Sequence, residues 1–321
     1  MTGASGFVGL ALTRVLEAKG HTVIRVLRHS GKADAERARP DSQVAILANL
    51  DARTDWRRIV RGHDVVIHLA ARAHQRAARQ SLADLRPVNV DATAQLARQA
   101  EVEGVQRFVY LSSIGVLGQS SALPLAETDS PAPVEPYAQS KHEAEMALRE
   151  LTAGTNMALT VIRPPLVYGP AAPGTFGRLL AWAQTGQPLP LGAIMANQRS
   201  LVGRDNLVDF IQRAVEHPGA ADQTFHVADD GVVSTTELLS ILAKAAGRHP
   251  RLLRVPSGLL RTGAGLVGRG DVAERLLGSL TVETRKAHER LDWRPLVSLE
   301  QGLRDAVSNH LIDDPRWHGH A

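Results

Sequence analysis

Short β-rich runs alternate with amphipathic stretches through the first half of the chain. Runs of apolar and β-branched residues predict strands at 23–27, 44–47, 65–69, 108–111 and 159–162. Between them, residues 10–19, 90–103 and 137–151 carry apolar positions three and four apart, the spacing of one helix face. Such alternation is typical of a parallel sheet covered by helices on both faces. We therefore predict an α/β fold with a doubly wound parallel sheet over residues 1–168.

The pattern changes after about Gly169. Residues 170–177 and 186–192 are rich in proline and glycine, which predicts loops. Further helices are expected near 206–216, 236–246 and 299–311, and a short strand near 224–228. We expect residues 169–321 to form a smaller α/β lobe whose loops close over a cleft, with some of its elements interleaved with the first domain.

Composition narrows the functional classes. The 321 residues include no cysteine, which excludes disulfides, thiolate zinc sites and a cysteine nucleophile and suits the cytoplasm. No apolar run is long enough to span a membrane and no signal segment is present, so we expect no membrane partner. The net charge is +4 and the arginines are scattered among acids, so we expect no nucleic acid. The histidines lack metal-ligand spacing, so no metal is expected.

A glycine-rich segment, Thr2-Gly3-Ala4-Ser5-Gly6-Phe7-Val8-Gly9, precedes the first predicted helix. Glycines at this spacing allow a tight turn and bring backbone N–H groups close to a pyrophosphate at the helix N-terminus. Alone the pattern is weak, because it arises by chance about 0.2 times in such a chain, and a helix-packing loop is the alternative. A central strand should precede it, yet only Met1 stands before Thr2. We expect about five further upstream residues to complete that strand, without which the cofactor site itself would be in doubt.

Three side chains form a candidate catalytic set. Tyr137 and Lys141 are four residues apart at the start of a predicted helix, so the phenol and the ammonium share one face. Ser113 follows the 108–111 strand, at the edge of the sheet where ligands bind. The serine can hydrogen-bond a carbonyl that the tyrosine protonates, while the lysine cation lowers the pKa of the phenol. This set suits reduction of a ketone by hydride, or oxidation of an alcohol in reverse.

These motifs resemble the extended short-chain dehydrogenase/reductases, the NAD-dependent epimerase/dehydratase family, over essentially the whole chain. The shared segments are Thr2-Gly3-x-x-Gly6-x-x-Gly9, His68-Leu69-Ala70-Ala71, Asn89-Val90-x-x-Thr93, Ser112-Ser113, Tyr137-x-x-x-Lys141 and Arg163-Pro164-Pro165-Leu166-Val167-Tyr168-Gly169-Pro170. The resemblance implies catalysis by Ser113, Tyr137 and Lys141, a Rossmann dinucleotide site, a UDP-linked sugar substrate and a homodimer formed through the helices at 90–103 and 137–151.

The same resemblance implies two sets of binding residues. Those expected around the NAD(P) cofactor are Gly3, Ser5, Gly6, Phe7, Val8, Arg28, Asn49, Leu50, Leu69, Ala70, Ala71, Asn89, Tyr137, Lys141 and Pro164. Those expected around the substrate are Ser113, Leu166, Phe176, Leu189, Leu191 and Arg199. Arg28 ends the second strand of such a fold, where an arginine pairs with a 2′-phosphate, so we expect NADP(H) to be used at least as well as NAD(H).

Two departures from the family pattern narrow the reaction. Dehydratases carry an Asp-Glu pair after the catalytic hydroxyl residue, where this chain has Ile114-Gly115, and many 4-epimerases carry Asn in place of Leu166. The segments at 163–170 and 197–202 most resemble bacterial UDP-4-keto-6-deoxy-N-acetylhexosamine 4-reductases, of the UDP-N-acetylquinovosamine type. We therefore expect NAD(P)H-dependent reduction of such a 4-keto sugar. A nucleotide-sugar 4-epimerase is the alternative, and a non-catalytic dinucleotide-binding sensor or scaffold is an alternative of another class.

Overall fold

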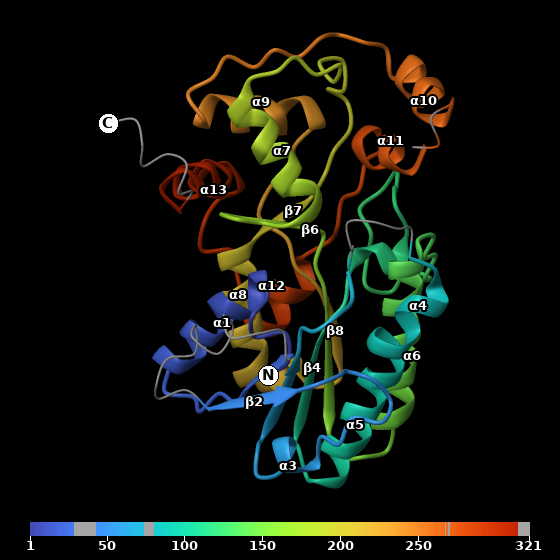
Figure 1. Cartoon of the computed structure of the whole chain (residues 1–321), viewed down its shortest axis with the longest axis vertical. Coiled ribbons are helices and arrows are strands. Elements are labelled where there is room, and N and C mark those ends of the chain that lie inside the picture. The colour runs from blue at the N-terminus through green and yellow to red at the C-terminus, as the bar shows by residue number, and fades with distance from the viewer. Residues whose placement is uncertain (29–42, 74–79, 267, 269, 314–321) are drawn as a thin grey trace.

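The structure is a computed structural model that describes residues 1–28, 43–73, 80–266, 268 and 270–313. Its main sheet is parallel throughout, with β2 beside β1 and the order β3-β4-β5-β8 alongside (Figure 1). Thr2 bridges Val26 of β1 and His68 of β3 and so joins the two parts. The strands are β1 (Arg25–Arg28), β2 (Val44–Leu47), β3 (Val65–His68), β4 (Arg107–Leu111), β5 (Ala158–Arg163) and β8 (Gln223–His226). The predicted doubly wound α/β fold is confirmed.

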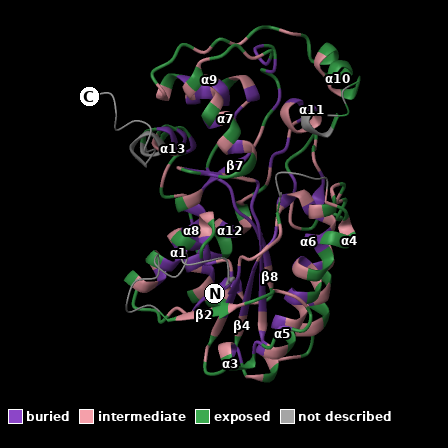
Figure 2. Ribbon diagram, viewed as in Figure 1, coloured by how far each residue is buried: buried purple, intermediate pink, exposed green. Residues whose placement is uncertain are grey.

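Helices cover both faces of this sheet (Figure 1). On one face, α1 (Phe7–Ala18), α8 (Arg204–Glu216) and α12 (Arg285–Leu291) pack around Leu12, Phe210 and Phe225. On the other, α5 (Ala92–Val102) and α6 (Pro136–Thr152) pack around Phe108. Figure 2 shows the buried residues concentrated along the strands and the exposed residues on the outer helix faces. The smaller elements of this domain are α3 (Arg57–Val60), α4 (Leu82–Arg86), the π-turn η1 (Pro87–Asp91) and the 3-10 turns η2 (Ile114–Leu117) and η3 (Pro218–Ala220).

The second lobe is built on a separate two-stranded sheet, β6 (Leu166–Tyr168) and β7 (Leu201–Gly203). Its helices are α7 (Gly174–Thr185), α9 (Thr235–Ala245), α10 (Ser257–Leu266), α11 (Gly270–Leu277) and α13 (Leu299–Asp313). The predicted loop at 170–177 is wrong in its last part, because α7 begins at Gly174 and buries Phe176 and Leu180. The chain also crosses back to the first sheet, since α8, β8 and α12 pack there.

Met1 and Thr2 lie between β1 and β3 in the main sheet. The Thr2 N–H donates to the Ile67 carbonyl at 3.0 Å, and the Val26 N–H donates to the Met1 carbonyl at 2.9 Å. These bonds join the two parts of the sheet.

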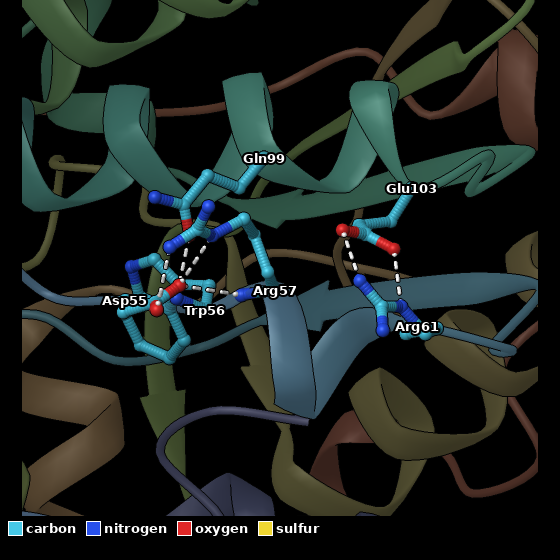
Figure 3. A network of polar contacts seen from close by, with 6 residues as sticks. All are labelled: Asp55, Trp56, Arg57, Arg61, Gln99 and Glu103. Atoms are coloured by element: carbon cyan, nitrogen blue, oxygen red, sulfur yellow. Dashed lines mark hydrogen bonds and ion pairs between the residues drawn. The ribbon is translucent and has the colours of Figure 1, made fainter.

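A polar network ties the segment after β2 to α5 (Figure 3). The Trp56 N–H donates to Gln99 Oε1 at 2.5 Å, and the Arg61 guanidinium donates to both carboxylate oxygens of Glu103 at 2.8 and 3.1 Å. Trp56 is completely buried, so this contact fixes α3 against α5. The network lies just beyond Asn49 and Leu50, the residues predicted to meet the adenine.

In the part of the chain that the structure describes, no helix is both long and apolar enough to cross a membrane. No group of three or more histidine or acidic side chains among the same residues is arranged to hold a metal ion.

Candidate functional site

The turn before α1 needs glycine at two positions. Gly3 has φ +69°, and a Cβ added there would lie 2.8 Å from the backbone nitrogen of Ala70. A Cβ on Gly9 would lie 2.1 Å from the Gly3 carbonyl oxygen. Gly6, the N-cap of α1, provides no side-chain cap, so the first N–H groups of the helix are available to phosphate oxygens. The glycine cradle therefore fits the pyrophosphate of a dinucleotide.

Substituting Gly9 with alanine tests whether the close approach of Gly9 to the Gly3 carbonyl matters more than the higher helix propensity of alanine. Gly9 lies within α1, where propensity alone favours alanine by about 1 kcal/mol. Because the new Cβ would meet the Gly3 carbonyl, we instead expect Gly9→Ala to lower the melting temperature and weaken NAD affinity at least about tenfold, as the loop shifts. Calorimetry and NAD titration measure both effects. Gly263→Ala in α10 is the control, since a Cβ there meets no atom within 4 Å; equal behaviour of the two variants would contradict the packing argument.

His68 fixes the segment that faces the glycine turn. Its Nδ1 lies 2.7 Å from Thr2 Oγ1 and its Nε2 lies 2.9 Å from Thr93 Oγ1. Burial lowers the pKa of this imidazole to about 3, so it is neutral at physiological pH. The Ala70 N–H donates to Thr2 Oγ1 at 3.3 Å, which positions the predicted cofactor segment Leu69-Ala70-Ala71 beside Gly3.

Asn89 lies behind this segment. Its amide oxygen accepts from the Arg72 N–H at 2.7 Å, and its amide nitrogen donates to the Arg72 carbonyl at 3.1 Å and to Ser140 Oγ at 2.9 Å. The side chain is fully buried. In this structure Asn89 therefore joins the loop after β3 to α6, and its direct contact with a cofactor stays a prediction.

The predicted catalytic residues converge where β4 ends and α6 begins. Ser113 is the N-cap of η2, and its Oγ accepts from the Gly115 N–H at 3.2 Å. A Cβ on Gly115 would lie 3.4 Å from both Ser113 Oγ and the Ala138 side chain, so η2 packs directly on the first turn of α6, which carries Tyr137. Burial raises the pKa of Tyr137 to about 12. The lowering of this pKa by Lys141 that the sequence led us to expect is therefore wrong for this structure, because burial outweighs it, and the phenol carries its proton at neutral pH, the form in which it can protonate a ketone.

Lys141 extends under the end of β4. Its buried Nζ donates to the Leu111 carbonyl at 2.6 Å and to Tyr110 Oη at 3.1 Å, and it lies 4.3 Å from the centre of the Tyr110 ring. Removal from water lowers the pKa of this ammonium to about 7, against the opposing charge of Glu145. Tyr110 was not among the site residues predicted from the sequence. Its place in the strand just before Ser112-Ser113 was the available signal.

A buried ion pair lies where β4, β5 and α6 meet, next to the predicted catalytic Ser113. The Arg163 guanidinium donates to both carboxylate oxygens of Glu145, from Nε at 2.9 Å and from Nη2 at 2.5 Å. Ser112 Oγ donates to Glu145 Oε1 at 2.5 Å. Both charged side chains are almost completely buried. This pair thus connects β4, β5 and α6 at the point where Ser113 leaves the sheet, and it too was missed from sequence.

The lowered pKa of Lys141 predicts how stability depends on pH. Lysine has a pKa near 10.4 in an unfolded chain, so between about pH 7 and 10 the unfolded state binds more protons and stability rises with pH. We expect the free energy of unfolding, measured with urea, to gain on the order of 1–2 kcal/mol from pH 7 to pH 9 through this residue. Lys141→Met should remove that gain. Parallel pH dependences in the two proteins would show that Lys141 is not the source.

The structure brings only some of the predicted substrate residues to a surface. Phe176 is fully buried against Tyr168, with ring centres 5.6 Å apart, and Leu191 is buried in the second lobe, so both act as core residues here. Leu166 is partly exposed at the start of β6, and Leu189 is partly exposed. Arg199 Nη1 donates to the Gly278 carbonyl at 3.0 Å, and burial lowers the pKa of this guanidinium.

The remaining cofactor predictions are placed as follows. The Asn49 carbonyl accepts from Thr54 Oγ1 at 3.2 Å, and Leu50 packs on the core beneath β2. The Pro164 carbonyl accepts from the Ile114 N–H at 3.0 Å, next to Ser113. Phe7 packs on Gly169, because a Cβ there would lie 3.1 Å from Phe7 Cζ. Ser5 is exposed and Val8 partly exposed in the glycine segment, and the Arg28 side chain lies outside the described residues.

Comparisons with known proteins show the family of this chain. The model of the NAD dependent epimerase/dehydratase family matches residues 1–228. This chain belongs to that family. A relative described as UDP-glucose 4-epimerase from Vibrio cholerae is 36% identical over 316 residues, covering 97% of this chain and 94% of the relative. GDP-6-deoxy-D-mannose reductase of Pseudomonas aeruginosa is 28% identical over 320 residues, with 96% and 95% covered.

Solved structures of family members share the fold. The crystal structure of UDP-glucose 4-epimerase with UDP-glucose from Thermotoga maritima has a TM-score of 0.77 and 25% identity, and the match covers 96% of each chain. Family membership makes this chain an enzyme of the NAD-dependent sugar-nucleotide epimerase, dehydratase and reductase group. The resemblance inferred from the motifs is thereby confirmed at the level of the family, whereas the reductase subgroup is not.

Proposed function

We propose that this protein is an NAD-dependent 4-epimerase of a UDP-linked hexose or N-acetylhexosamine. The observation that carries the proposal is the 36% identity to the Vibrio cholerae UDP-glucose 4-epimerase along 97% of the chain. The glycine cradle fits a dinucleotide, and the family description names NAD, so NAD replaces the NADP preference expected from Arg28. The comparisons give no support to NADP.

Ser113, Tyr137 and Lys141 would together handle the proton at the C4 oxygen of the sugar. NAD supplies a hydride acceptor and donor when bound. Tyr137 in its phenolate form takes the proton from the C4 hydroxyl, and the phenol so formed later returns that proton to the ketone oxygen, which the Ser113 hydroxyl holds by a hydrogen bond. The Lys141 ammonium stabilises the phenolate before the first transfer and after the second. Arg199, with its partly buried guanidinium, is suited to a diphosphate.

A reductase is the second candidate. Leu166 in place of the asparagine found in many 4-epimerases favours it, and so does the likeness to the Pseudomonas reductase. The Ile114-Gly115 pair, which cannot perform acid–base work, argues against a dehydratase. Ser113, Tyr137 and Lys141 serve both candidates equally. The two differ in the fate of the hydride, which an epimerase returns to the same sugar.

The deciding experiment follows product and cofactor separately. One reaction contains UDP-glucose or UDP-N-acetylglucosamine with catalytic NAD⁺, and chromatography detects the 4-epimer. The other contains a UDP-4-keto-6-deoxy-N-acetylhexosamine with NADH or NADPH, and absorbance follows nicotinamide oxidation. Epimer without net cofactor consumption supports the proposal. Stoichiometric oxidation in the second reaction without epimer in the first would replace it by the reductase. NAD binding without turnover in either would indicate a sensor or scaffold.

A further inference from the structure

The outer corner of the second lobe exposes large apolar side chains, and Figure 2 shows the ribbon of α10 at this corner coloured mostly as exposed. The exposed fractions are 56% for Leu253, 65% for Leu259 and 85% for Leu266. Leu259 and Leu266 are seven residues apart in α10, so they lie on the same side of that helix. None of the residues of α10 is fully buried. Leucines in these positions contribute nothing to the core of the lobe.

The opposite side of α10 attaches this helix to the second lobe. Leu260 and Ala264, four residues apart, pack against a cluster that contains Leu191 and Leu239. Arg261 Nε lies 3.6 Å from Glu274 of α11. The helix is therefore held in place by one face while the other presents leucines outward, an arrangement typical of a surface helix with a second apolar contact.

Along the chain, the charged residues that flank these leucines are basic, although Glu274 of α11 pairs with Arg261. No aspartate or glutamate occurs between Leu238 and Gly270, although the chain has 33 acids in 321 residues. Arg248, Arg251 and Arg254 fall in this stretch, and all three are exposed. We define the basic leucine patch as Arg248, Arg251, Leu253, Arg254, Leu259 and Leu266.

The patch continues into the stretch predicted to contact the substrate. The Leu189 N–H donates to the Arg251 carbonyl at 3.0 Å, and the Leu253 N–H donates to the Leu189 carbonyl at 2.8 Å. Figure 1 shows α10 at the edge of the second lobe, remote from α3 and the amino-terminal part of the main sheet. The patch thus lies at an extremity of the molecule, where a flat partner can approach it.

We propose that the basic leucine patch binds an anionic membrane surface. Arginines attract anionic headgroups, and leucines between them insert at the level of the acyl boundary, which is how interfacial helices bind. Single-stranded nucleic acid fits less well, because the patch has no aromatic residue on which bases would stack. The lack of a spanning segment led us to expect no membrane partner, but interfacial binding requires no such segment. The proposal goes beyond the enzymatic function and does not depend on it.

Vesicle co-sedimentation tests the proposal with the full chain. We expect at least about tenfold more protein on vesicles of phosphatidylcholine with 30% phosphatidylglycerol than on phosphatidylcholine alone, and a marked loss in 0.5 M salt. The double variants Leu259→Ser/Leu266→Ser and Arg251→Ala/Arg254→Ala should each lose most of this binding. The matched control is Leu296→Ser with Arg285→Ala, which removes an equally exposed leucine (70%) and an exposed arginine elsewhere.

Several outcomes would overturn the proposal. They are no binding to anionic vesicles, equal binding to neutral ones, or equal losses in the patch variants and the control. Sedimentation velocity without lipid examines the other occupant, a second copy of the chain. Self-association abolished by Leu259→Ser/Leu266→Ser would assign the patch to an oligomer interface instead. Unchanged melting temperatures of the patch variants show that they remain folded, which their exposure leads us to expect.

Discussion

Replacing Tyr137 with phenylalanine should lower kcat by about 10²–10⁴-fold while the protein stays folded and still binds NAD. The substitution deletes one hydroxyl and keeps the ring, so the packing of the first turn of α6 is preserved. Its high pKa, about 12, means that the phenol carries the proton at neutral pH, and phenylalanine has none to transfer. Turnover of a UDP-sugar under saturating substrate and NAD, with a separate NAD titration, measures the two effects.

Tyr168→Phe provides the matched control for this variant. Tyr168 is buried and donates to Asp229 Oδ2 at 2.6 Å, away from Ser113 and Lys141. Its loss should lower stability while leaving kcat of the folded protein within a few-fold of the original. A Tyr137→Phe protein with near-normal kcat, or one no worse than Tyr168→Phe, would contradict the assignment of Tyr137 as the proton donor.

Arg163→Met should cost about 3–5 kcal/mol of unfolding free energy, because it leaves the Glu145 carboxylate buried without its main partner. Methionine fills similar space, so the loss measures the unpaired charge more than a cavity. Adding Glu145→Leu should restore much of the stability, since replacing both members by apolar groups removes the unpaired charge. Urea unfolding of the two variants and the original protein gives both differences.

Arg61→Met is the control for this ion pair, because Arg61 also holds a carboxylate through two hydrogen bonds, to Glu103. That arginine is largely exposed, with 69% of its side chain accessible, so its loss should cost far less. Comparable losses in Arg61→Met and Arg163→Met would mean that burial does not determine the effect, and the proposed importance of the Glu145–Arg163 pair would fail.

Local patterns in the sequence were enough to predict the main sheet, and the candidate catalytic set stays a prediction. The apolar runs at 44–47 and 65–69 contain all of β2 and β3, because runs of apolar and β-branched residues favour strands. The glycine loop and the Tyr137–Lys141 spacing are equally local. The helix α7 was not predicted, because Gly174 and Gly177 obscure a helix that is stabilised by burying Phe176 and Leu180.

Contacts between distant segments were beyond sequence reasoning. Tyr110 meets Lys141 across 31 positions, and Arg163 meets Glu145 across 18, and no periodic pattern reports such pairs. The choice between reductase and epimerase was not decided by the sequence for a related reason. Leu166 is a single predicted contact with the substrate, whereas the fate of the hydride depends on how the whole site holds and releases its sugar.

The contact between Trp56 and Gln99 has a consequence for cofactor affinity. Asn49 and Leu50, which are predicted to contact adenosine, follow β2, and this contact fixes the segment after them to α5. Ser113, Tyr137 and Lys141 stand on other elements, at the end of β4 and in α6. Local opening of the segment after β2, in the sense of native-state hydrogen exchange, would therefore lower cofactor affinity while the predicted catalytic residues stay folded.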